Sequence, residues 1–150
     1  MILVEIFYRE RENLAMNTAL KIFLDSQNEN GEYNKQMLIQ LYNDTDDNTV
    51  LQILARFHET LVESIQKIER ALDSGENRDA TWKAAHKIAG TAELVGFASL
   101  GHIARDLSHE LKDAPATAES DESVRKFLKL IRTNKEVIST AFPNYRDYLL

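Results

Sequence analysis

The sequence of 150 residues contains no cysteine, only two prolines and only five glycines. The absence of cysteine excludes disulfide bonds, cysteine-ligated zinc and thiol catalysis, and it suits a reducing compartment. Few prolines and glycines mean few turns, which favours long helices over a sheet of many strands. No apolar run approaches the roughly 18 residues that span a bilayer, and the first residues, MILVEIFYRERE, do not resemble a secretory signal. We therefore expect a cytoplasmic protein without a membrane partner.

An excess of positive charge is also missing. The chain has 18 basic and 24 acidic residues, a formal net charge of -6, which argues against nucleic acid as a partner. The hydrophobic fraction of 43% and the length are those of one globular domain with a single core. We interpret the basic residues of the last predicted helix as a solvated face: Arg125, Lys126, Lys129, Arg132 and Lys135.

Apolar residues recur at steps of three or four along most of the chain, the spacing of amphipathic helices. The pattern predicts helices over most of 3–27, over 35–43, 50–72, 79–95 and about 99–111, and over 121–140. Met37 and Ile103 are among the residues predicted to face inward. The predicted fold is all-α: an antiparallel four-helix bundle at 32–142, preceded by a helical extension at 1–31 and followed by a tail at 143–150.

The stretch AAHKIAGTAELVGFASL, residues 84–100, holds the candidate site. On a helical wheel His86 and Gly90 fall outside the core face, together with Lys83 and Lys87. A glycine inside a helix costs about 1 kcal/mol relative to alanine, and here it leaves open space for another macromolecule beside the imidazole. The wheel assigns six residues to the core face: Trp82, Ala85, Ile88, Ala89, Ala92 and Val95.

The chemistry that suits an exposed histidine between lysines is covalent. A neutral imidazole, with an ordinary pKa of about 6.5, is a nucleophile that can hold a phosphoryl group as a phosphoramidate. Neither a phosphate-binding loop nor a magnesium site is evident, so the phosphoryl donor must bring its own machinery. We expect no cofactor and no metal, because His102 and His109 are seven apart rather than four. His58 is interpreted as a partly buried or boundary residue of the long helix.

The segment AAHKIAGTAELVGFASLGHIARDLSHEL resembles the signature of histidine-containing phosphotransfer (HPt) domains, A-H-x-x-K-G-S with a further glycine six residues later. The similarity covers about residues 34–112 well and the last helix loosely. It implies a four-helix bundle in which His86 is the phosphoacceptor. By position Gly90 and Gly96 match the two glycines of the family, Thr91 matches the small hydroxyl residue, and Ala89 replaces the usual lysine.

This resemblance implies a phosphocarrier without kinase activity of its own. His86 would accept a phosphoryl group from a receiver-domain aspartate, or from a histidine kinase, and pass it to another response regulator, with magnesium on the receiver. Two alternatives remain: a helical adaptor that no longer carries phosphate, and the phosphoacceptor domain of a chemotaxis-type kinase. We expect receiver domains or a hybrid histidine kinase as partners, and a monomer or weak dimer. The predicted partner-binding residues are Lys83, Lys87, Gly90, Glu93 and Arg105.

Overall fold

The computed structural model describes residues 16–27, 32–74, 78–113 and 118–149, and within these ranges the chain is helical without a strand. The prediction of an all-α protein is confirmed. The helices are α2 (Thr18–Ser26), α3 (Lys35–Asp44), α4 (Asp47–Ser74), α5 (Arg78–Ala92), α6 (Ala98–Asp113), α7 (Ala118–Ala141) and the short 3-10 helix η1 (Tyr145–Tyr148).

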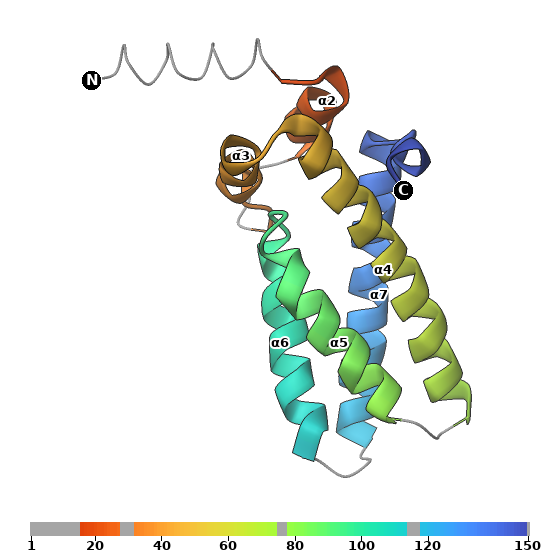
Figure 1. Cartoon of the computed structure of the whole chain (residues 1–150). Helices are drawn as coiled ribbons and strands as arrows, with labels where there is room; N and C mark the ends of the chain where they lie inside the picture. Colours follow the sequence, from red (N-terminus) through yellow and green to blue (C-terminus); the bar gives the residue numbers. More distant parts are fainter. Residues whose placement is uncertain (1–15, 28–31, 75–77, 114–117, 150) are drawn as a thin grey trace.

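Helices α4 to α7 lie side by side and alternate in direction, so they form the predicted antiparallel four-helix bundle (Figure 1). In this bundle α5 packs against α4 and α6, and α7 packs against the same two helices. Helices α2, α3 and η1 gather at one end of the bundle (Figure 1). None of the described helices is both long enough and apolar enough to cross a membrane.

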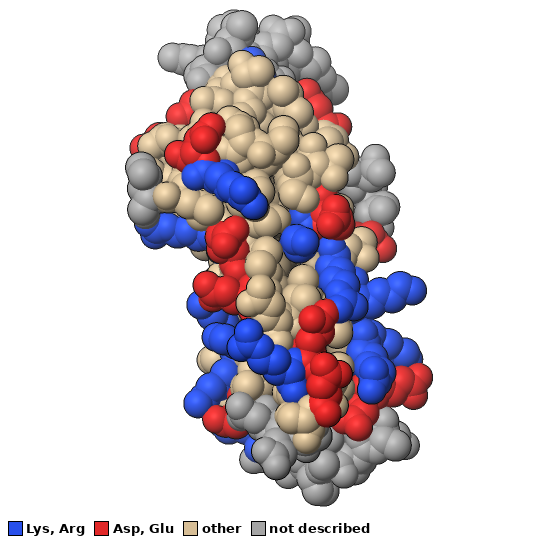
Figure 2. Space-filling view, turned by 90° about the vertical axis from the view of Figure 1, so that its right-hand side faces the viewer, with Lys and Arg blue, Asp and Glu red and all other residues tan. Residues whose placement is uncertain are grey.

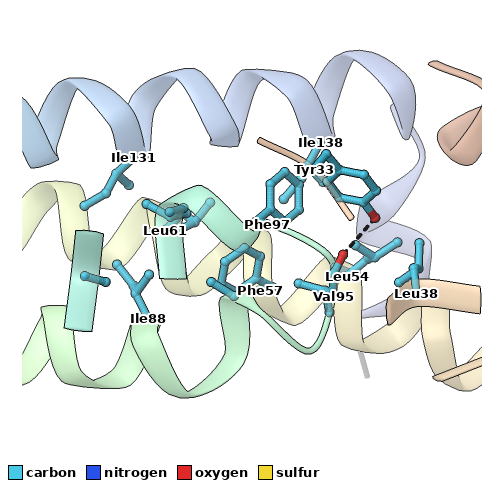
Figure 3. Close-up of a cluster of buried hydrophobic side chains, with 14 of the residues drawn as sticks. Tyr33, Leu38, Leu54, Phe57, Leu61, Ile88, Val95, Phe97, Ile131 and Ile138 are labelled. Carbon is cyan, nitrogen blue, oxygen red and sulfur yellow. Dashed lines mark hydrogen bonds between the residues drawn. The ribbon is translucent and has the colours of Figure 1, made fainter. Parts of the chain in front are cut away.

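The core follows from the apolar stripe of each helix. On α4 the residues at steps of three or four are buried, among them Leu54, Phe57 and Leu61, and they meet Ile88 of α5 and Ile131 of α7 (Figure 3). Burial of such side chains contributes roughly 1.5–3 kcal/mol each relative to exposure. These contacts hold α5 in place between its neighbours, and α5 is the helix that carries His86.

The turn after α5 is held by the segment that precedes α3. Gly96 has a φ of 95°, a conformation that favours glycine, and its carbonyl accepts a hydrogen bond of 2.7 Å from the backbone N–H of Asn34. The Tyr33 hydroxyl donates to the carbonyl of Val95 at 2.8 Å (Figure 3). Burial raises the pKa of Tyr33, so the phenol keeps the proton that it donates. Phe97 packs against Tyr33 with ring centroids 5.0 Å apart.

Helix α2 belongs to the same core. Leu20 and Phe23 are fully buried, and the Phe23 ring lies 5.9 Å from Tyr33 and 6.4 Å from Phe97, centroid to centroid. The predicted helix over 3–27 is present as α2 only from Thr18 to Ser26, and its residues 3–15 lie outside the described part of the chain. The boundary at residues 31 and 32 stays a prediction.

Several side chains lie elsewhere than the periodicity predicts. Met37 and Ile103 were expected to face inward but are 38% and 39% exposed. The reason is that α3 buries only Leu38, while α6 buries the narrower stripe of Leu100, Ala104, Leu107 and Leu111. His58, expected to be partly buried or at a boundary, is almost fully buried, at 2% exposure.

On the face that Figure 2 shows, basic and acidic side chains are interspersed along the lower part of the bundle. Three basic residues of α7 form ion pairs: Arg132 with Glu69 of α4, Lys126 Nζ with Glu122 Oε1 at 3.5 Å, and Lys135 Nζ with Glu136 Oε1 at 3.7 Å. These acidic partners offset part of the positive charge of the helix.

Candidate functional site

Helix α5 presents His86 to solvent, as the helical wheel predicts. Four apolar residues of this helix, Ala84, Ala85, Ile88 and Ala92, are buried against the bundle, whereas the imidazole of His86 is exposed. The small alanines allow α5 to lie close to α4 and α6. The imidazole of His86 therefore stands on a helix that is fixed along its inner face.

Gly90 lies one turn after His86 and is exposed. A Cβ atom placed there would have no heavy atom within 4 Å apart from its chain neighbours and the backbone of its own helix. Packing within the described chain therefore does not require glycine at this position, although glycine weakens the helix by about 1 kcal/mol. Gly101 of α6 is different, because its Cβ would lie 2.7 Å from Cγ of Glu93; glycine there permits the close contact with α5. The open space predicted beside His86 is present.

The charged residues predicted around His86 lie on two flanks of α5. Lys83 and Lys87 line a groove of about 250 Å³ between α4 and α5, which Ser64 and Lys67 also line. Glu93 faces α6, where its Oε1 lies 2.8 Å from Nη2 of Arg105. The structure thus brings Glu93 and Arg105 together and sets the two lysines apart from them.

Two of the three predicted cations are engaged in ion pairs. Lys83 Nζ lies 2.9 Å from Oδ2 of Asp79, and Arg105 is paired with Glu93. Exposed pairs of this kind contribute less than about 1 kcal/mol, so an incoming anion can compete for either cation. Lys87 is exposed and has no ion pair among the residues that the structure describes. Ala89, where the family pattern has lysine, is half-buried.

The sequence did not predict the role of Trp82. It was assigned to the core face, but its side chain is half-buried, and its ring stacks on the imidazole of His86 with centroids 5.6 Å apart and planes inclined by 15°. The signal that could have indicated this contact is the spacing of four residues, which places two side chains on the same face of a helix.

Two large apolar residues, one in the turn after α5 and one on α6, are exposed. Leu94, in the turn that follows α5, is 43% exposed, and Ile103 on α6 is 39% exposed. Sequence reasoning did not single out Leu94. Their apolar area is available for contact with another protein.

Histidine, aspartate and glutamate do not gather into a metal site within the described ranges, where no group of three or more such residues is found. His102 Nε2 lies 3.4 Å from Oδ2 of its neighbour Asp106, and His109 is exposed. The prediction that the protein has no metal or cofactor of its own stays a prediction.

Comparison with known protein families gives one result. The family model of the Hpt domain matches residues 52–138, more than half of the chain, a range that runs from α4 into α7 and includes His86. Neither the search of curated proteins nor that of solved structures gave a match.

Proposed function

Because this chain belongs to the Hpt domain family, whose members act as histidine phosphotransfer modules in two-component signalling, we propose that His86 is its phosphoacceptor. The observation that carries the proposal is the exposed imidazole on α5, with open space at Gly90 one turn away. A receiver domain must bring its aspartyl phosphate into line with a ring nitrogen, and a side chain at position 90 would stand in its path.

The transfer needs no further reactant from this chain. A ring nitrogen of His86 attacks the phosphorus of the aspartyl phosphate, the N–P bond forms, and the O–P bond breaks with its electron pair left on the aspartate carboxylate. The reverse sequence delivers the group to a second receiver. We propose that the receiver holds the magnesium ion that neutralises the phosphoryl oxygens, so this protein is a carrier and not a kinase.

Three features of the surface support docking of a receiver. Lys87 supplies positive charge next to His86, on the helix where Ala89 replaces the family lysine. Leu94 and Ile103 supply exposed apolar area. We propose that Lys83 and Arg105 exchange their intrachain carboxylates for groups of the partner, and that Glu93 orients Arg105 until then.

The half-buried Ala89 also favours a second candidate function. An adaptor that binds a receiver or kinase without carrying phosphate would need no cation at this position. The third alternative, the phosphoacceptor domain of a chemotaxis-type kinase, differs in its donor, because the phosphate would come from a kinase domain and not from a receiver.

The test uses a purified receiver domain that carries labelled phosphate on its aspartate, with magnesium present. The wild-type protein should acquire label that is stable to alkali and labile to acid, the behaviour of a phosphoramidate. His86→Gln should abolish the label, whereas His109→Gln, which changes another exposed histidine, should keep it.

Label that survives His86→Gln would overturn the assignment of the phosphoacceptor. Binding to the receiver without any label would favour the adaptor. Label acquired from a kinase domain with ATP, but from no receiver, would favour the chemotaxis-type arrangement. The last two outcomes would each favour one alternative, and label that His86→Gln abolishes would support the phosphocarrier.

A further inference from the structure

The imidazole of His86 has one close partner in the structure, the indole of Trp82. The two rings are nearly parallel, at 15°, and their centroids are 5.6 Å apart. Within the described part of the chain, the imidazole of His86 has no hydrogen bond and no ion pair. The orientation of the nucleophile therefore depends on ring stacking rather than on a polar contact.

We propose that Trp82 is a positioning residue for His86, an inference that rests on the proposed function and deepens it. Packing against the core restrains the half-buried ring of Trp82, which also lines a hollow with Leu111 and Lys112 at the end of α6. A flat ring held this way covers one face of the imidazole. The imidazole then keeps its plane parallel to the indole, with the edges that carry the nitrogens open to solvent.

This arrangement acts on the transfer step in two ways. First, it removes ring orientations in which neither nitrogen is in line with an incoming phosphoryl group, so less freedom is lost at the moment of attack. Second, the imidazole gains positive charge as its nitrogen bonds to phosphorus. A tryptophan face attracts a cation within about 6 Å of its centroid, and the 5.6 Å separation lies inside that limit. Both effects favour the transition state over the free protein.

The contact itself can be tested without any phosphotransfer. Trp82 is the only tryptophan of the chain, so its indole resonances are assigned without ambiguity. Nuclear Overhauser effects between the indole protons and the carbon-bound ring protons of His86 are expected in the full-length protein. Their absence would overturn the inference whatever the transfer rates are.

The consequence for transfer is tested with Trp82→Leu and Trp82→Phe. Leucine keeps apolar bulk but has no aromatic face, whereas phenylalanine restores one. An aromatic pair contributes a factor of about two to ten in an equilibrium. We therefore expect Trp82→Leu to lower the maximal transfer rate at saturating receiver by about two- to tenfold with little change in receiver affinity. Trp82→Phe should recover most of that loss.

The control for a general loss of stability is Leu130→Ala, which truncates another half-buried residue, on α7. It should lower the melting temperature without changing the maximal rate. A Trp82→Leu protein that transfers as fast as the wild type, or a Trp82→Phe protein as slow as the leucine variant, would overturn this inference alone. A wild type that accepts no label from its receiver would overturn the proposed function as well.

Discussion

Replacing His58 with leucine is expected to remove a pH-dependent weakness of the fold. His58 lies on α4 and is 2% exposed, and neither ring nitrogen has a hydrogen-bond partner. Its Nδ1 lies 3.5 Å from Oε1 of Glu59, at the long limit for a hydrogen bond. Its ring packs on Tyr145 of η1, with centroids 4.0 Å apart. The imidazole is thus a polar group enclosed without satisfied nitrogens.

Burial lowers the pKa of His58 in the folded protein. The carboxylate of Glu59 opposes this shift, Lys135 of α7 reinforces it, and Glu136 of α7 opposes it. Arg146 is the charged residue that η1 contributes next to Tyr145. The net effect lowers the pKa of His58 and favours the neutral ring, because desolvation is the largest contribution.

The sign of the effect follows from proton binding. The unfolded chain protonates this histidine at a pKa of about 6.5, and the folded protein does so only at lower pH. Between these two values the unfolded state binds more protons. The free energy of unfolding therefore falls by up to about 1.4 kcal/mol for each pH unit below about 6.5, until the folded-state pKa is passed. Above pH 6.5 this contribution vanishes.

The leucine variant lacks both the titration and the unsatisfied nitrogens. Near pH 7.5 it should be as stable as the wild type or more stable by about 1 kcal/mol, and its advantage should grow as the pH falls. Urea unfolding followed by circular dichroism at several pH values between about 5 and 8 measures the difference. His58→Phe keeps a ring against Tyr145. It shows whether loss of the ring contact contributes to the difference in free energy of unfolding between the wild type and His58→Leu.

The control is His109→Leu, which removes an exposed histidine and should give a stability curve parallel to that of the wild type. A constant difference between the wild type and the His58→Leu variant over the whole pH range would refute the reasoning. So would a wild type that gains stability relative to the variant in acid.

Two glycines give opposite predictions. Gly90→Ala should raise the free energy of unfolding by about 1 kcal/mol, because alanine favours the helix and its Cβ meets no atom beyond its own helix. The same variant should accept phosphate from a receiver more slowly. Urea unfolding measures the first effect and the labelling assay the second, and a destabilised variant would contradict the open geometry. Gly96→Ala should lower the free energy of unfolding by about 1–3 kcal/mol, because φ is 95° and the new Cβ would lie 2.6 Å from Cζ of Tyr33; an unchanged melting temperature would contradict this expectation.

The bundle and the exposure of His86 could be predicted because each depends on one helix at a time. Seven apolar residues of α4 recur at steps of three or four from Val50 to Leu72. Five of them are fully buried: Val50, Leu54, Phe57, Leu61 and Ile68. On α5 the same periodicity separates the buried Ile88 from the exposed His86 and Gly90. A helix buries its apolar face whichever helices lie beside it. Which of its residues are buried can therefore be predicted without knowing how the helices are arranged.

For the residues that sequence reasoning misplaced, the degree of burial depends on which neighbouring helix covers which side of their own helix. Ile103 continues the apolar pattern of α6 but lies beside the narrow stripe that is covered. His58 is a polar residue for which the sequence predicts partial burial or a boundary position. Tyr145 of η1, near the end of the chain, packs on its ring and helps to bury it. The stack of Trp82 on His86 depends on side-chain rotamers, which the order of amino acids does not reveal.

The three-ring cluster of Phe23, Tyr33 and Phe97 has a practical consequence for shortened versions of this protein. A chain trimmed to begin at Tyr33 would lose the Phe23 ring and uncover the rings of Tyr33 and Phe97, which lie at the turn between α5 and α6. Receiver binding and labelling measured on such a fragment would then reflect a less stable turn between α5 and α6 as well as the chemistry of the His86 imidazole. Expression boundaries should therefore be placed ahead of Asn17, whose side chain accepts the Ala19 N–H at the start of α2.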